Sequence, residues 1–205
     1  MLTNVYIDGF NFYYGAVKGT PHKWLDFAAL CRILLPAHRI QHIYYFTALV
    51  EARPNDLNKK IRQQTYLRAL ETLPNLTIIR GSFLSHIKKM PLANGKGYTD
   101  VIYTQEKGSD VNLAAQMLLD GFRNLYECAV VISNDSDLVR PIQMVIHDLN
   151  KKVGVLAPTH NKRPSRSLTD NSTFIKHIRP NVLAASQFPP ILKDIRGSFR
   201  RPDNW

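Results

Sequence analysis

Runs of apolar residues alternate along this chain with segments in which apolar residues recur every three or four positions. The clearest boundary follows Val130, Val131 and Ile132, an unbroken β-branched run that is typical of a strand buried on both faces of a parallel sheet. Polar residues 133–137 come next, and apolar positions then return at helical spacing through Leu149. The pattern predicts a strand-to-helix junction at 133–137, and ligands of open parallel sheets bind at such junctions.

The same alternation predicts an α/β architecture for most of the chain. Strands are expected near residues 4–8, 40–49, 76–79, 130–132 and 153–156, with an edge strand at 173–178. Helices are expected at 12–17, from Asp26 to Pro36, from Pro54 through Leu70, from Asp110 to Phe122 and from 138 to 149. Because strands and helices alternate, we expect a three-layer, Rossmann-like parallel sheet covered by helices on both faces.

Residues 82–104 interrupt this alternation. They contain Lys88, Lys89 and the dipeptide Asn94-Gly95, which favours the tight turn of a β-hairpin. We therefore expect a β-hairpin excursion from the main sheet. Its two lysines either reach over a substrate or belong to a solvated basic loop.

Length and cysteine content limit the class of protein. The chain has 205 residues and 44% hydrophobic content, which is enough for one well-buried domain. Its two cysteines, Cys31 and Cys128, are too few for a zinc cage or a disulfide framework, so a reducing compartment is expected. With no signal peptide and no membrane-spanning apolar run, we expect a cytoplasmic protein with no membrane partner.

Positive charge is concentrated near the C-terminus. The formal net charge is +11, and residues 151–205 contain eleven Lys and Arg residues against three Asp and Glu residues. We expect a domain at 1–180 and a basic, partly disordered tail at 181–205 that binds a polyanion such as nucleic acid. The expected nucleic-acid contacts are Lys88, Lys89, Lys107, Lys162, Arg163, Arg166, Arg196, Arg200 and Arg201.

Aspartates mark the predicted ends of two strands and the start of a helix. Asp8 ends the first strand, Asp135 and Asp137 follow a later one, and Asp110 opens a helix. If the two strands are neighbours, these carboxylates meet at one rim, where Mg²⁺ or Mn²⁺ would relieve their repulsion. The alternative is structural: Ser136 or Asp137 caps a helix, and Asp110 complements a helix dipole.

Three linked motifs resemble the NYN-domain family, a branch of the PIN-like nucleases that includes the bacterial LabA-like proteins. The motifs are Ile7-Asp8-Gly9-Phe10-Asn11, Lys107-Gly108-Ser109-Asp110 and Ser133-Asn134-Asp135-Ser136-Asp137. The resemblance implies the strand order 3-2-1-4-5 and a metal-dependent ribonuclease site formed by Asp8, Asp110, Asp135 and Asp137. Asn11 and Ser133 match positions that support or join that site. Asn134 departs from the family pattern, in which a small residue such as Gly is frequent.

The implied reaction is phosphodiester hydrolysis with one or two metal ions and water as the nucleophile. Lys107 either stabilises charge in the transition state or neutralises the acidic rim. RNA, preferably single-stranded, is favoured over DNA by family analogy alone, and a homodimer is possible. The alternatives are a non-catalytic RNA-binding module and, less favoured, a phosphatase of the haloacid-dehalogenase type, which needs an Asp-x-Asp pair after the first strand where Phe10 stands.

Overall fold

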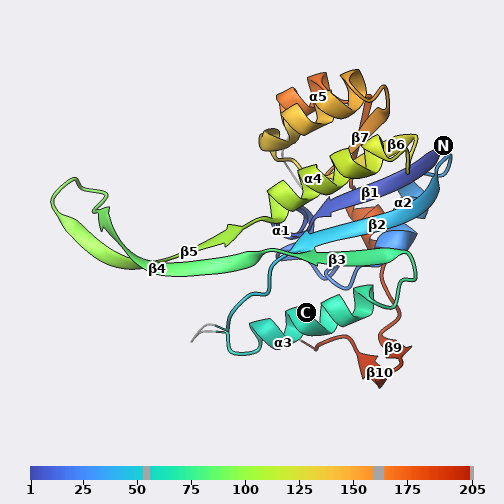
Figure 1. Ribbon diagram of the computed structural model, residues 1–205. Coiled ribbons are helices and arrows are strands. Elements are labelled where there is room, and N and C mark those ends of the chain that lie inside the picture. Colours follow the sequence, from blue (N-terminus) through green and yellow to red (C-terminus); the bar gives the residue numbers. More distant parts are fainter. Residues whose placement is uncertain (53–55, 159–163, 204–205) are drawn as a thin grey trace.

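The computed structural model of the protein describes residues 1–52, 56–158 and 164–203 (Figure 1). At its centre is a six-stranded sheet in the order β3-β2-β1-β6-β7-β8, in which every neighbouring pair of strands is parallel. Its strands are β1 (Leu2–Asp8), β2 (Arg39–Thr47), β3 (Leu76–Arg80), β6 (Cys128–Ile132), β7 (Lys152–Ala157) and β8 (Phe174–His177). The parallel α/β sheet is confirmed, whereas the five-strand order is not confirmed as it stands, because β8 adds a sixth strand at one edge.

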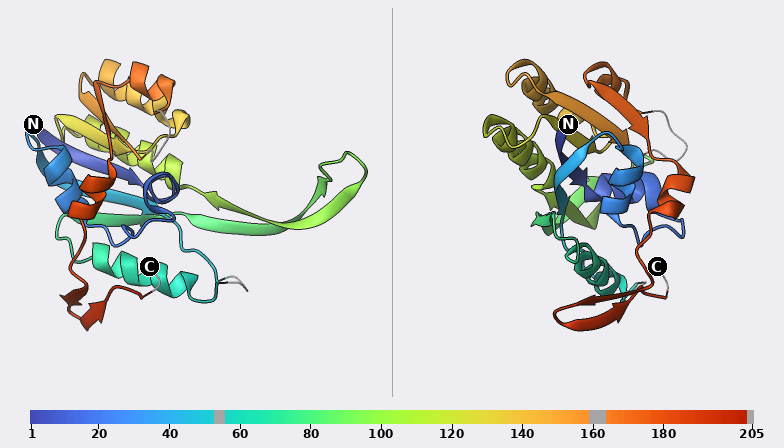
Figure 2. Two further views of the ribbon diagram at one scale, coloured as in Figure 1. Left: turned by 180° about the vertical axis from the view of Figure 1, so that it is seen from behind. Right: turned by 90° about the vertical axis from the view of Figure 1, so that its right-hand side faces the viewer.

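Helices cover both faces of the sheet, as the right-hand view of Figure 2 shows. One face carries α1 (Gly9–Phe12), the π-helical turn η1 (Tyr13–Val17), α2 (Phe27–Leu34), α3 (Lys59–Leu70) and α7 (Pro180–Ala185). The other carries α4 (Ser109–Phe122), the 3₁₀ turn η2 (Ser136–Leu138), α5 (Val139–His147) and α6 (Arg166–Asp170). Alternate residues of β1 point to opposite faces of the sheet, since Val5 and Ile7 pack in one core and Tyr6 packs in the other.

Local signals account for several helix boundaries. The Asp26 carboxylate accepts hydrogen bonds from the backbone N–H groups of Ala28 (2.8 Å) and Ala29 (3.0 Å), so it caps α2 as predicted. The helix predicted to open at Pro54 begins at Lys59, and Pro54 itself lies outside the described residues. Across the described ranges, no helix has both the length and the apolar character needed to cross a lipid bilayer.

The predicted β-hairpin is present and projects far from the body of the molecule (Figures 1 and 2). It consists of the antiparallel strands β4 (Ser82–Pro91) and β5 (Tyr98–Lys107). In the turn, Gly95 has a φ of 71°, and the Asn94 side chain accepts a hydrogen bond from the Lys96 N–H at 2.9 Å. These two residues supply the left-handed backbone and the local hydrogen bond that such a turn requires.

The C-terminal segment is folded against the body, and the expected disorder is wrong for residues 181–203. Beyond α7 it forms a small antiparallel hairpin of β9 (Ile191–Asp194) and β10 (Gly197–Arg200), which lies near α3 in Figure 1. Trp24 donates its indole N–H to the carbonyl of Pro189 at 2.9 Å, and Arg68 donates to both oxygens of Asp194 at 2.8 and 2.7 Å. Such bidentate pairing fixes orientation as well as distance. The division of the chain near residue 180 stays a prediction.

Candidate metal centre

Three of the predicted aspartates meet at the carboxyl end of the sheet. Asp8 ends β1, Asp110 lies in the first turn of α4, and Asp135 follows β6. Strands β1 and β6 are parallel neighbours with Ile7 opposite Ile132, so the residues that follow them emerge side by side. Each of the three carboxylates offers one oxygen, and these oxygens all lie within 4.8 Å of one another.

A hydrogen-bond chain fixes the orientation of Asp8, which is only 5% exposed. One of its oxygens accepts the backbone N–H of Asn11 at 2.9 Å, and the other accepts the hydroxyl of Ser133 at 3.0 Å. The Ser133 hydroxyl in turn accepts the backbone N–H of Asp135 at 3.1 Å. Asn11 and Ser133 therefore hold the loops after β1 and β6 together around the carboxylate.

The electrostatics of this cluster are unfavourable for ionised carboxylates. Burial raises the pKa of Asp8 to about 6, with smaller contributions from the charges of Asp110 and Asp135, although the hydrogen bonds from Asn11 and Ser133 oppose the shift. Burial and then the charge of Asp135 also raise the pKa of Asp110. A cation among these oxygens would remove the repulsion, and carboxylate oxygens are the ligands that Mg²⁺ and Mn²⁺ prefer. The three carboxylates therefore fit a metal ion, whose identity they do not specify.

Asp137 stands apart from the other three aspartates. It is exposed and is not one of the three residues whose oxygens converge. Its backbone N–H donates to Asp135 at 3.0 Å, so Asp135, rather than Ser136 or Asp137, caps the turn that opens this helical segment. Asp137 contributes to the rim through charge, as one of the groups that raise the pKa of Asp110.

Asn134, the departure from the family pattern, links two segments. Its backbone N–H donates to the Asn11 side chain at 2.9 Å, while its own side-chain oxygen accepts the Ser165 N–H at 2.7 Å. Where a glycine would have no side chain, this amide connects the end of β6 to the segment that leads into α6.

Sequence reasoning missed Glu106. Its carboxylate accepts the Ser109 N–H at 3.2 Å and the Ser109 hydroxyl at 2.8 Å, so it satisfies donors at the start of α4. Its charge also raises the pKa of Asp110. The available signal was an acidic side chain three residues before the helix. Lys107 occupies the next position of β5, and consecutive strand residues point to opposite faces.

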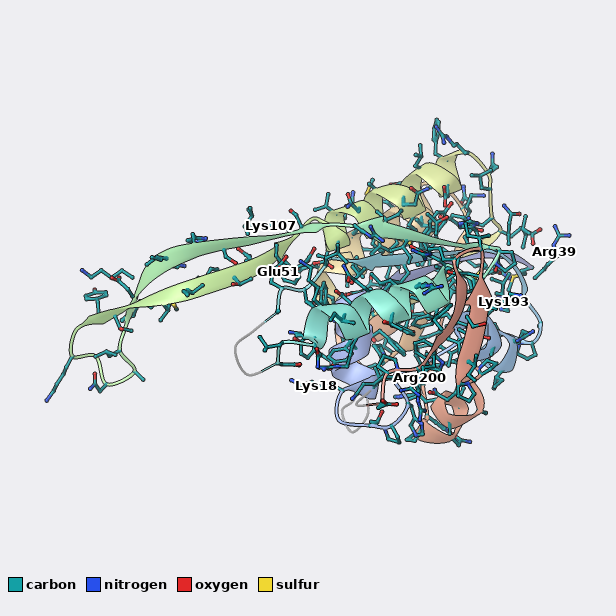
Figure 3. All side chains as sticks on the ribbon, turned by 90° about the horizontal axis from the view of Figure 1, so that it is seen from below. Lys18, Arg39, Glu51, Lys107, Lys193 and Arg200 are labelled. Atoms are coloured by element: carbon teal, nitrogen blue, oxygen red, sulfur yellow. The ribbon has the colours of Figure 1, made fainter. Side chains whose placement is uncertain are left out.

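The carboxylates line an open cleft of about 1410 Å³ between the base of the hairpin and the loop after β2. Glu106 and Glu51 line it as well, whereas Lys107 does not. In Figure 3 Glu51 lies beside the base of the hairpin, where Lys107 is also labelled. The aromatic side chains of Phe10, Tyr14 and Phe83 form part of the same lining.

The predicted nucleic-acid contacts are dispersed. Lys88 lies over the Tyr103 ring at 5.0 Å, on the hairpin face opposite to the one that lines the cleft, and Lys89 lies across from Asp100. Arg166 pairs with Asp170 at 3.5 Å on the surface. Lys162 and Arg163 lie outside the described residues.

The predicted C-terminal contacts Arg196, Arg200 and Arg201 do not line the acidic cleft. Figure 3 shows Lys193 and Arg200 on the body, well away from Lys107. Arg196 pairs with Glu71 and Asp194, and Arg200 pairs with Asp203. The Arg201 backbone N–H donates to the Pro190 carbonyl. Acidic partners thus offset part of the positive charge of this segment.

Three comparisons with known proteins give matches for this chain. The family model for the NYN domain matches residues 2–178. The chain is 30% identical over 236 residues to 6-hydroxy-3-succinoylpyridine 3-monooxygenase HspA of Pseudomonas putida (strain DSM 28022 / S16), with 99% of this chain and 75% of that protein covered. A crystal structure of a protein of unknown function, VPA0982 of Vibrio parahaemolyticus RIMD 2210633, is similar with a TM-score of 0.57 and 15% identity, covering 88% of this chain and 94% of the other. The fold is thus nuclease-like, and the chain belongs to the NYN-domain family.

Proposed function

We propose that this protein is a metal-dependent endoribonuclease that hydrolyses RNA phosphodiester bonds. The observation that carries the proposal is the convergence of Asp8, Asp110 and Asp135 within 4.8 Å, in a chain that belongs to a nuclease-like family. Mutual repulsion makes such a cluster unfavourable on its own, so its presence at the ligand-binding end of the sheet supports a metal site.

In this proposal Asp8, Asp110 and Asp135 hold Mg²⁺ or Mn²⁺. When bound, the metal would polarise the phosphate and lower the pKa of an attacking water. Ser133 and Asn11 keep the Asp8 oxygens aimed at the shared position. Asp137, at the exposed rim two residues after Asp135, would orient the attacking water.

Electrostatic stabilisation of the substrate phosphate is assigned to cations near the cleft. Lys59 lines the cleft, whereas Lys107 lies on the opposite face of β5. A role for Lys107 in the transition state therefore requires the hairpin base to turn towards the substrate.

A cleavage assay tests the proposal directly. Short labelled single-stranded RNA and DNA would be incubated with the protein in Mn²⁺, Mg²⁺ or EDTA. Metal-dependent cleavage by the wild type, lost in Asp135→Asn and retained in the surface control Asp170→Asn, supports it. Equal cleavage by wild type and Asp135→Asn would reveal a contaminating nuclease, and RNA binding without cleavage would favour the non-catalytic module.

One observation favours a second candidate, the monooxygenation of a hydroxypyridine. A relative that is 30% identical over nearly the whole chain has the name of such an enzyme. The test is oxygen uptake and NAD(P)H oxidation in the presence of 6-hydroxy-3-succinoylpyridine. Turnover of that compound without RNA cleavage would replace the nuclease proposal, whereas RNA cleavage without oxygen uptake would remove this candidate.

A further inference from the structure

A second, smaller pocket of about 150 Å³ adjoins the acidic cleft. It lies between the α1–η1 segment and α3, with residues of β2 also lining it. The pocket and the cleft have four lining residues in common: Phe10, Tyr14, Val50 and Lys59. A Cβ on Gly9 would lie 2.7 Å from the ring of Tyr45, which lines the pocket. The backbone that follows Asp8 therefore contacts a side chain of the pocket. One short segment therefore borders both sites.

Aromatic side chains form much of the pocket wall. The rings that line it are Phe10, Phe12, Tyr13, Tyr14, Tyr45 and Tyr66. Tyr45 and Tyr66 stand nearly perpendicular to each other, at 85° and with ring centroids 6.5 Å apart. A cavity of this volume accommodates a benzene-sized molecule. The shape and the lining therefore suit one planar ring with a small substituent.

The charge of this pocket is opposite to that of the cleft. Its charged lining residues are Lys23, Lys59, Arg62 and Asp56. Arg62 already pairs with Asp56 at 2.6 Å. Lys23 is half-buried, and the ion pairs found among the described residues do not include it. An anion is thus favoured in this pocket and disfavoured in the acidic cleft beside it.

We infer that this pocket binds a planar aromatic ring that bears one anionic group. The ring packs among Tyr13, Tyr45 and Tyr66, and the anion lies towards Lys23. Two sources share this chemistry: a free pyridine carboxylate, or the base and phosphate of one nucleotide in a strand. The inference does not depend on RNA hydrolysis, because the pocket uses neither Asp110 nor Asp135.

Isothermal titration calorimetry in EDTA tests the inference, since chelation removes any metal that could bind a carboxylate at the cleft. The probes are nicotinate, its uncharged amide nicotinamide, and uridine monophosphate. We expect nicotinate or the nucleotide to bind with a Kd of about 1 mM or lower, and nicotinamide to bind at least about tenfold more weakly than nicotinate. If nicotinate binds more tightly, the natural ligand is a free aromatic acid. If the nucleotide binds more tightly, the natural ligand is a nucleotide within a strand.

Two variants and a matched control locate the binding. Lys23→Met should raise the Kd of the anionic probe about tenfold or more, and Tyr13→Ala should weaken it as well. Lys96→Met, the same change in the hairpin turn, should leave the Kd unchanged. Thermal melting of each variant checks that it is folded. The inference would be overturned by no saturable binding of either anionic probe, by an unchanged Kd in folded Lys23→Met or, where nicotinate binds, by equally tight binding of nicotinamide. Failure of the RNA cleavage assay would leave it intact.

Discussion

Two buried carboxylates, those of Asp120 and Asp8, lie at different positions along the central strand β1. Asp120, on α4, is 1% exposed and accepts hydrogen bonds from Tyr6 at 2.8 Å, Asn4 at 3.3 Å and Gln116 at 2.8 Å. All three donors are neutral. Asp8 is almost as buried, but its neighbours include two further carboxylates.

The difference separates a structural carboxylate from one placed for a ligand. Neutral donors satisfy Asp120, and burial, followed by the charge of Asp120, raises the pKa of the Tyr6 phenol. At Asp8, hydrogen bonds offset only part of the cost, and the shared position among three carboxylates stays open to a cation. The same substitution, Asp to Asn, should therefore act oppositely at the two places.

The largest expected effect is on catalysis. Asp135→Asn should lower the kcat for RNA cleavage at least about a hundredfold, because a negative ligand of the metal is lost. Folded Asp120→Asn should retain kcat within a few-fold. Steady-state kinetics on both variants check this. A similar loss of kcat in the two variants would show that the structural carboxylate and the cluster carboxylate do not differ in their effect on catalysis.

The second effect is on stability. Asp120→Asn replaces one acceptor oxygen by an amide donor, so a buried donor from Tyr6, Asn4 or Gln116 loses its partner. We expect the free energy of unfolding to fall by about 2 kcal/mol in urea denaturation. In metal-free buffer Asp135→Asn should lose no stability. If Asp135→Asn is the more destabilised variant, then the capping hydrogen bond of Asp135 contributes more to the unfolding free energy than its repulsion by the other carboxylates removes.

The third effect is a pH dependence confined to the metal-free protein. Burial in the folded chain raises the pKa of the Asp8 carboxyl from its ordinary value of 3.8, which is taken for the unfolded chain, to about 6. Between these values the folded state holds a proton that the unfolded state has released. Stability should therefore fall as pH rises from about 4 to about 6, by about 3 kcal/mol, and then level off. Urea titrations of wild type and Asp8→Asn in EDTA check this, since the variant should lack most of the decline.

The smallest effect concerns the helix that carries both Asp110 and Asp120. Glu106→Ala removes the acceptor of two Ser109 donors and should cost about 1 kcal/mol of unfolding free energy. Glu106→Gln keeps an acceptor oxygen and should cost less. If both variants have the unfolding free energy of the wild type, then water can bind the two Ser109 donors as well as Glu106 does, and Glu106 is not a stabilising cap.

Local patterns predicted much of the framework. The uninterrupted run Val130–Ile132 predicted a buried strand, and β6 is buried along its whole length. Asp26 caps a helix and Asn94-Gly95 forms a hairpin turn, both as predicted. In each case the deciding interaction lies within a few residues, so the local chain contains the information.

Long-range contacts explain what the sequence could not predict. The basic C-terminal residues were expected to form a loose tail, yet Arg68 binds Asp194 at a separation of 126 residues. The Asp120 network connects Asn4 and Tyr6 to a helix more than a hundred residues away. The acidic rim was predicted because parallel strands end at the same edge of a sheet. That three of the four predicted aspartates converge depends on side-chain directions, which the spacing of residues along the sequence does not specify.

Thermal melting with added Mn²⁺ tests most directly the central claim that Asp8, Asp110 and Asp135 form a metal site. A ligand that binds the folded cluster and not the unfolded chain stabilises the fold by about 2.7 kcal/mol at a hundredfold excess over Kd. The account predicts that millimolar Mn²⁺ raises the Tm of the wild type and of Asp120→Asn, but not that of Asp135→Asn. No rise in the wild type, or an equal rise in Asp135→Asn, would contradict it.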